Sequence, residues 1–192
     1  MAANIMQTSV VDDLVTFLCS LSPSCQLVVV LCGIPGCGKS TFSKGLCEKC
    51  DRYASENAAK RHWRSFNQDA LGSRNAVYRE ADSALRQGFN IIIDRCNFDL
   101  EQRAHWIRLA NGWRNTVAIA LVMPNHTDLQ VCEERAFNRV DDIHDPLTDW
   151  HAVCTGMARS YLRPTCREGF AYVVECATSH ELENVQTALA SR

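Results

Sequence analysis

The stretch that decides the fold is LCGIPGCGKST, residues 31–41, where an apolar run ends in closely spaced glycines. Its spacing matches the phosphate-loop pattern G-x-x-x-x-G-K-[ST]. The fixed positions are Gly33, Gly38, Lys39 and Ser40. Glycines there allow successive backbone N–H groups to curl around an anion. A chance glycine turn would not supply all of these positions, so the stretch predicts a phosphate-binding loop.

The flanking segments are those that such a loop requires. Residues 26–32, QLVVVLC, are apolar and rich in β-branched residues, which predicts a strand buried on both faces. A helix is predicted from Lys39 to about Cys50. We expect Lys39 to pair with the β- and γ-phosphates of ATP, Ser40 to bind Mg²⁺, and the positive end of the helix dipole to face the phosphates.

Length and composition restrict the class of protein. A chain of 192 residues with 46% apolar content suits one domain with a sizeable core. Eleven scattered cysteines, an odd number with no secretory signal before them, indicate reduced thiols in an intracellular protein, cytoplasmic or nuclear. The apolar runs fall short of the roughly 20 residues that a membrane helix needs, so we expect a soluble protein with no membrane partner. The net charge of -2 neither supports nor excludes nucleic-acid binding.

Hydrophobic periodicity predicts alternating strands and helices along the rest of the chain. Further strands are predicted at 62–66, 89–94, 116–123 and 170–176. Further helices are predicted at 10–21, 73–87, 100–110, 127–140, 150–162 and after residue 176. Five short strands alternating with helices are typical of an α/β protein with a parallel, doubly wound sheet that binds ligands at the carboxyl ends of its strands.

Asp94 closes the buried strand NIIID, where a carboxylate is costly unless a cation or a hydrogen bond receives it. A magnesium ion with its waters would do so, which predicts Ser40 and Asp94 as the metal ligands. The alternative is a strand-end residue that caps the next turn through Asn97 and Asp99.

Asp69 follows a short predicted strand in SFNQDALGSR, at the sheet edge where an acceptor would approach the γ-phosphate. A carboxylate there can accept the proton of an attacking hydroxyl. An Asx turn or a helix N-cap is an equally good interpretation of the local sequence.

Arg135 and Arg139 are spaced i and i+4 in CEERAFNR and share one face of a predicted helix. They suit a clamp on a polyphosphate, and the alternative is a solvated face paired with neighbouring acids. The predicted nucleotide-binding residues are Gly33, Pro35, Gly36, Cys37, Gly38, Lys39, Ser40, Thr41 and Arg135.

A basic and aromatic cluster suits either a nucleic-acid groove or a solvated connector. It consists of Arg52, Lys60, Arg61, His62, Trp63 and Arg64.

Four segments resemble, in order and spacing, the 5′-hydroxyl polynucleotide kinase family of P-loop phosphotransferases. They are GIPGCGKST, FNQDALGSR, GFNIIIDRCNFDLEQRAHW and CEERAFNR, within residues 26–176. The resemblance implies a three-layer P-loop kinase fold with a central five-stranded parallel sheet and a helical lid. It implies a single kinase domain over 1–192, with an N-terminal packing helix in 1–24, the core in 26–176 and a terminal helix in 177–192.

By this resemblance, the chain transfers the γ-phosphate of ATP to the 5′-hydroxyl of DNA or RNA ends, with Mg²⁺. Lys39, Asp69, Arg135 and Arg139 are then the catalytic residues, with Asp69 as the general base and the arginines in the lid. Asp69, Arg74, Arg79 and Asn97 are the implied substrate-binding residues, with Arg74 or Arg79 holding the acceptor phosphate.

The chain departs from the family at two motifs, because Ala70 follows the catalytic aspartate and DRCNF replaces the commoner DNTN type. DRCN is similar to kinase modules beside aprataxin-like domains in repair proteins. No H-x-H-x-H, D-x-D-x-T or K-x-D-G motif occurs, so phosphatase, ligase or repair functions would belong to partner proteins. A small-molecule kinase and a non-catalytic ATP-binding module are the alternatives.

Overall fold

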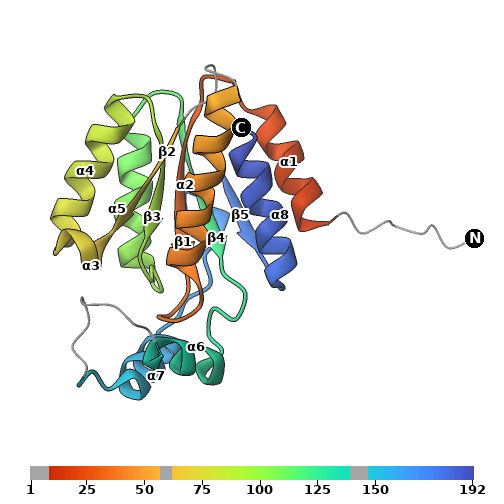
Figure 1. Cartoon of the computed structure of the whole chain (residues 1–192). Helices are drawn as coiled ribbons and strands as arrows, with labels where there is room; N and C mark the ends of the chain where they lie inside the picture. The colour runs from red at the N-terminus through yellow and green to blue at the C-terminus, as the bar shows by residue number, and fades with distance from the viewer. Residues whose placement is uncertain (1–8, 57–61, 139–146) are drawn as a thin grey trace, which may run out of the picture.

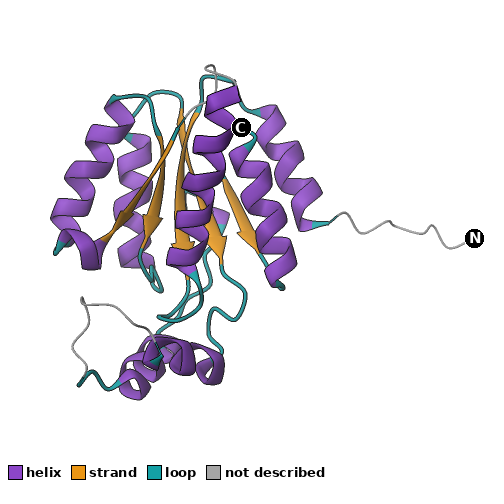
Figure 2. Cartoon of the chain, in the orientation of Figure 1, coloured by secondary structure: helices purple, strands orange, loops and turns teal. Residues whose placement is uncertain are grey.

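The computed structural model describes residues 9–56, 62–138 and 147–192. A parallel five-stranded sheet forms its centre, with strand order β2-β3-β1-β4-β5 (Figures 1 and 2). The strands are β1 (Gln26–Cys32), β2 (Trp63–Asn67), β3 (Asn90–Asp94), β4 (Thr116–Val122) and β5 (Tyr172–Glu175). The α/β class and the parallel sheet are therefore confirmed.

Helices cover both faces of the sheet and one end of it. They are α1 (Val10–Ser20), α2 (Lys39–Glu56), α3 (Gln68–Leu71), α4 (Arg74–Arg86), α5 (Leu100–Asn111), α6 (Leu129–Phe137), α7 (Trp150–Arg159) and α8 (Ser179–Ala190), with a 3-10 turn η1 (Cys166–Glu168). Helices α1, α2 and α8 share one apolar cluster with the sheet, and α4 and α5 share the other. Helices α6 and α7 lie beyond the carboxyl ends of the strands as a lid (Figure 1).

Side-chain alternation in β1 explains why this strand is central. Leu27, Val29 and Leu31 point into the cluster with α2 and α8, whereas Val28 and Val30 point into the cluster with α4 and α5. All five are fully buried. Successive side chains of a strand face opposite sides, so a strand between two helical layers must be apolar at every position.

Helix α3 was not predicted, because four residues are too few to show a helical period. Its ends are set by local chemistry instead. The side chain of Asn67 accepts hydrogen bonds from the backbone N–H groups of Asp69 at 2.7 Å and Ala70 at 3.3 Å, and Gly72 ends the helix at φ 78°. Helix α4 follows directly, and its N-cap is Ser73, whose side chain accepts a hydrogen bond from the backbone N–H of Ala76.

The predicted boundaries shift at several other elements. Helix α2 continues to Glu56, and α6 ends at Phe137, whereas residues 139 and 140 of its predicted span lie outside the described residues. The turn η1 was not predicted. None of the described helices is both long and apolar enough to cross a bilayer.

Among the described residues, the basic and aromatic cluster predicted around β2 is divided between the core and the surface. Trp63 is buried in the core, Arg64 places its guanidinium 3.9 Å from the ring centroid of Phe89, and Lys60 and Arg61 lie outside the described residues.

Candidate active site

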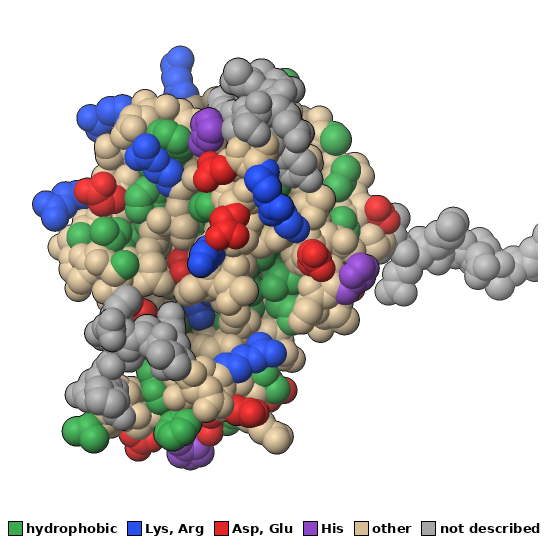
Figure 3. All heavy atoms as spheres, in the orientation of Figure 1, with side chains coloured by type: hydrophobic (Ala, Val, Ile, Leu, Met, Phe, Trp, Pro, Cys, Tyr) green, Lys and Arg blue, Asp and Glu red, His purple; other side chains and the backbone are tan. Residues whose placement is uncertain are grey.

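A cavity of about 900 Å³ lies between the carboxyl ends of the strands and the lid. Its walls come from residues 35–41 after β1, 67–69 at the end of β2, 94–96 and 98 at the end of β3 and 124–125 after β4, with Arg135 and α7 residues on the lid side. The molecular surface is hollowed between the sheet core and the lid helices (Figure 3). Segments far apart in the sequence therefore meet in one site.

The phosphate loop is held from both neighbouring strands. The N–H of Gly33 donates to the carbonyl of Cys96 at 2.9 Å, and the N–H of Ile34 donates to that of His126 at 3.0 Å. Gly36 has φ 82°, and a Cβ there would overlap the carbonyl oxygen of Cys132 in α6. This close approach requires glycine, because any side chain would push the loop away from the lid helix.

Lys39 is buried against the loop that precedes it. Its Nζ donates to the carbonyl oxygens of Gly33 at 3.0 Å and Ile34 at 2.8 Å, and to Sγ of Cys37 at 3.5 Å. Burial opposes the charge, but Cys96, Cys37 and Asp94 raise the pKa of Lys39 above its ordinary value. The ammonium group therefore stays charged at neutral pH, and it lines the cavity.

Asp94 uses one carboxylate oxygen for the protein and keeps the other free. Its Oδ2 accepts from Asn67 at 3.0 Å and from Ser43 at 3.3 Å. Its Oδ1 is buried and has no hydrogen-bond partner among the described residues. A buried, unpartnered carboxylate oxygen in the cavity that Ser40 also lines suits a divalent cation such as Mg²⁺. Neither of these hydrogen bonds goes to the turn after β3, where the side chain of Asp99 caps α5.

Asp69 lines the cavity from α3 and is exposed to it. The capping alternative fails here as well, because Asn67 caps α3 and Ser73 caps α4. The carboxylate of Asp69 therefore caps neither helix, and Asp69 lines the same cavity as Lys39.

Arg135 is exposed on α6 and lines the cavity from the lid. Its neighbour Glu133 bonds to His151 at 3.1 Å, on the adjacent lid helix. Arg139, predicted to share its role, lies outside the described residues.

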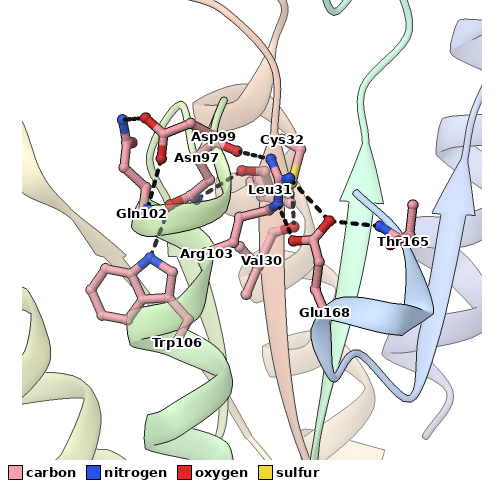
Figure 4. Close-up of polar contacts among 10 residues, drawn as sticks. All are labelled: Val30, Leu31, Cys32, Asn97, Asp99, Gln102, Arg103, Trp106, Thr165 and Glu168. Carbon is pink, nitrogen blue, oxygen red and sulfur yellow. Dashed lines mark hydrogen bonds and ion pairs between the residues drawn. The ribbon is translucent and has the colours of Figure 1, made fainter. Parts of the chain in front are cut away.

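Asn97 requires a correction, because its side chain is fully buried and used within the protein. Its amide nitrogen donates to the carbonyl of Leu31 at 2.8 Å, and its Oδ1 accepts from Nε1 of Trp106 at 2.9 Å (Figure 4). Asn97 also has φ 46°, a conformation that asparagine tolerates better than most residues. It is therefore a structural residue and not a substrate contact.

The two arginines predicted to hold the acceptor phosphate differ from each other. Both are exposed on α4, and neither is among the residues that line the cavity. Arg74 nevertheless acts electrostatically on a residue of the site. The pKa of Arg95, which lines the cavity, is lowered mainly by burial and then by the charge of Arg74. Among the described residues, Arg79 has no corresponding effect on the pKa of Arg95.

Sequence reasoning missed several residues that line the cavity. They are Asn67, Gln68, Arg95, Cys96, Phe98, Gln102, Pro124, Asn125, Thr148, Trp150, Val153, Met157, Ser179 and Leu182. For Arg95 a signal was present, since it directly follows Asp94 at the end of a predicted buried strand. The sequence does not determine where its side chain points, because that depends on the long-range hydrogen bonds of the loop after β3.

A parallel sheet with a glycine loop at the end of its central strand, a buried lysine and a facing lid define a P-loop kinase-like nucleotide-binding domain. Residues 28–164 match the model of a family described as "AAA domain", and the chain belongs to that family.

Two curated proteins are similar in sequence. The chain is 32% identical over 167 residues to transcription factor bHLH140 of Arabidopsis thaliana, covering 83% of this chain and 17% of the relative. It is 28% identical over 153 residues to the bifunctional polynucleotide phosphatase/kinase of Schizosaccharomyces pombe, covering 78% of this chain and 33% of the relative. The chain thus spans a third or less of the length of these relatives.

Solved structures share the fold. Chaetomium thermophilum Kti12 in complex with ADP-AlF3 superposes with a TM-score of 0.60 and 17% identity, covering 85% of this chain and 96% of that one. A fungal RNA kinase superposes with a TM-score of 0.62 and 14% identity, covering 87% of this chain and 44% of that one.

Proposed function

We propose that this chain transfers the γ-phosphoryl group of ATP to the 5′-hydroxyl end of DNA or RNA. The observation that carries the proposal is that Asp69, Lys39 and Arg135 line one cavity, although they follow or belong to three different elements. A base, a phosphate-binding lysine and a lid arginine are the groups that phosphoryl transfer needs.

The order of the strands suggests where each substrate lies. The loop after the central strand β1 takes the phosphates at the N-terminus of α2. Residues after β2 and β3, including Asp69, lie to one side and would face the acceptor. Pro124 after β4 and Leu182 in α8 lie to the other side and would face the nucleoside of ATP.

In the proposed reaction, Asp69 accepts the proton of the acceptor hydroxyl as its oxygen bonds to the γ-phosphorus. The bond from that phosphorus to the β,γ-bridging oxygen breaks, and ADP leaves. Lys39 and Arg135 balance the charge on the transferring group. Ser40 and Asp94 would hold Mg²⁺, which neutralises charge on the phosphate oxygens when bound.

The choice of a polynucleotide as acceptor is supported by the sequence similarity to the S. pombe phosphatase/kinase. The resemblance of four segments to the 5′-hydroxyl polynucleotide kinase family supports the same choice. This proposal assigns the kinase step alone to the chain. A phosphatase, ligase or other repair protein would act as a separate partner.

The test is transfer of labelled γ-phosphate, with Mg²⁺, to matched oligonucleotides of DNA and RNA that carry either a 5′-hydroxyl or a 5′-phosphate. We expect label only on 5′-hydroxyl ends. Asp69→Asn should lower kcat about 100- to 10,000-fold with ATP affinity kept. Asp51→Asn, an exposed carboxylate on α2, is the matched control. Transfer to free nucleosides or sugars that an oligonucleotide cannot compete away would instead identify a small-molecule kinase.

A further inference from the structure

Cysteines from four separate parts of the chain surround the phosphate loop. They are Cys37 in the loop itself, Cys96 after β3, Cys132 in α6 and Cys154 in α7. The backbone of Cys132 lies against Gly36, and Sγ of Cys154 lies 4.0 Å from the carbonyl oxygen of Pro35. All four are free thiols, and the proposed phosphoryl transfer uses none of them.

Of these four cysteines, only Cys37 and Cys96 line the nucleotide cavity. Cys132 and Cys154 are fully buried, and the thiol of Cys132 donates to the carbonyl of Asn125 at 3.2 Å. Cys37 is 3% exposed, whereas Cys96 is partly exposed. A small molecule that enters the cavity therefore reaches Cys96 more readily than Cys37.

Gly33 connects these two cysteines in space. Its N–H donates to the carbonyl of Cys96 at 2.9 Å, and a Cβ added at Gly33 would lie 2.5 Å from Sγ of Cys37. Because residue 33 is glycine, its side chain does not separate the sulfur of Cys37 from the segment that carries Cys96. The two segments are in direct contact here, as a bridge between their side chains requires.

The ammonium group of Lys39 lies beside both sulfurs. Its Nζ is 3.5 Å from Sγ of Cys37. Burial lowers the pKa of Lys39, but Cys96 and then Cys37 raise it most strongly, so Cys96 is close to the ammonium as well. A cation beside a sulfur stabilises the negative charge of an attacking thiolate. The cavity therefore provides surroundings in which thiols react.

A buried network holds the segment that carries Cys96 in place. Arg103 is fully buried, donates to the carbonyl of Asn97 at 3.1 Å and pairs with Glu168 (Figure 4). The side chain of Asn97 also donates to the carbonyl of Leu31 at 2.8 Å. Cys96 is therefore kept next to the phosphate loop.

We propose that Cys37 and Cys96 form a redox modification site, and that hydrogen peroxide converts them to a disulfide that prevents tight binding of ATP. This inference goes beyond the proposed function and requires only that the cavity binds ATP. The backbone N–H groups of the phosphate loop must curl around the phosphates. A bridge ties Cys37 to the segment after β3, so the loop is fixed in one conformation and no longer adapts to the nucleotide.

The partly exposed Cys96 reacts first. Its sulfur attacks one oxygen of the peroxide, the O–O bond breaks, and a sulfenic acid and water form. The sulfur of Cys37 then attacks the sulfur of Cys96, the S–O bond breaks, and a second water leaves. In total the two thiols lose two electrons and two protons, and one molecule of hydrogen peroxide is reduced to two molecules of water.

The first test locates the bond. Reduced protein is treated with a small excess of hydrogen peroxide, with and without MgATP, and its remaining thiols are alkylated. Trypsin then releases residues 1–39, which include Cys37, and residues 96–103, in which Cys96 is the single cysteine. We expect mass spectrometry to find these peptides linked through Cys37 and Cys96. MgATP should reduce the yield, because the nucleotide occupies the cavity.

Binding of a fluorescent ATP analogue gives the functional readout. Oxidation of the wild type should raise the Kd at least about 10-fold, and dithiothreitol should restore it. Each variant is compared with its own reduced form. Cys37→Ser should lack the linked peptide, and Cys96→Ser should lack both the linked peptide and the loss of affinity. Cys166→Ser, which removes an exposed thiol, is the matched control and should respond as the wild type does. Thermal unfolding shows whether each variant keeps the fold.

The outcomes separate this inference from the proposed function. It is overturned if oxidised wild type contains no linked peptide, if residues 96–103 are linked to a cysteine other than Cys37, or if the linked protein keeps its ATP affinity. A loss of affinity that persists in Cys96→Ser overturns it too. None of these readouts needs an acceptor. A chain that forms the disulfide and loses ATP binding, yet phosphorylates no polynucleotide when reduced, overturns the proposed function alone.

Discussion

The side-chain nitrogen of Asn67 lies 3.0 Å from Oδ2 of Asp94, which joins the carboxyl ends of the neighbouring strands β2 and β3. The bond uses Oδ2, and the other oxygen, Oδ1, has no hydrogen-bond partner among the described residues. It also places the cap of α3, and hence Asp69, next to the proposed metal ligand. One asparagine therefore links the metal side of the site to its acceptor side.

Asp94→Asn should weaken Mg²⁺ dependence while the fold is kept, because the amide is isosteric and uncharged. Losing a charged ligand costs about 1.5–3 kcal/mol, so the Mg²⁺ concentration for half-maximal transfer should rise about 10- to 100-fold. Mg²⁺ titration of the transfer rate measures this change. Ser43→Ala, which removes a hydrogen bond to Asp94 but keeps the carboxylate, should leave the titration almost unchanged. Equal midpoints in Asp94→Asn and wild type would exclude Asp94 as a ligand.

Gly36→Ala should abolish tight ATP binding. Alanine at φ 82° is strained by about 1–2 kcal/mol, and its Cβ would overlap the carbonyl of Cys132, so the loop must move. Gly72→Ala is a matched control, since Gly72 has φ 78° with nothing within 4 Å of the added Cβ. Calorimetric titration with ATP should show lost affinity only in Gly36→Ala. Comparable affinities in the two variants would mean that the approach to α6 does not shape the site.

Arg135→Ala should lower kcat at saturating ATP by about 100- to 1000-fold, because a lid arginine acts most strongly on the charge of the transferring group. We predict a similar loss for Arg139→Ala. Arg159→Ala, at the end of α7, serves as the control on the lid. Steady-state kinetics at saturating ATP measure the effect, and a variant that keeps the full kcat would remove that arginine from the mechanism.

Arg103→Leu should destabilise the fold by about 3–5 kcal/mol, because Glu168 would be left as an unpaired, nearly buried carboxylate. Replacing both residues with leucine should recover part of this free energy of unfolding, since no lone charge remains. Urea unfolding of wild type, both single variants and the double variant measures the coupling. Additive single and double effects would show that the pair is not coupled.

The buried thiols should resist alkylation in the folded protein. Burial raises the pKa of Cys32 and Cys132 to about 12 and that of Cys154 to about 11. A raised thiol pKa favours the protonated form, so at pH 8 the reactive thiolate of a group with pKa about 12 is on the order of one in ten thousand. Iodoacetamide should label the exposed Cys19 and Cys166 first, as peptide mass spectrometry can show. Labelling of Cys32 at the same rate would contradict the prediction, and the urea-unfolded protein, where all thiols react, is the control.

Much of the fold could be predicted from the sequence, because its signals are local. The strand Gln26–Cys32, the loop up to Ser40 and the start of the next helix follow from β-branched runs, glycine spacing and helical periodicity. The same signals found five strands in the correct order along the chain. They missed α3 and η1, which at four and three residues are too short for a periodic pattern to repeat.

Only the tertiary structure decided which polar residues after the strands face the cavity. Asn97 and Arg95 stand two positions apart, yet Asn97 turns inward to Leu31 and Trp106, whereas Arg95 lines the cavity. The difference depends on partners far away in the sequence, such as Glu168, which lies 65 residues from Arg103. A local pattern determines that the chain turns at a strand end. Long-range hydrogen bonds and packing determine where each side chain of that turn points.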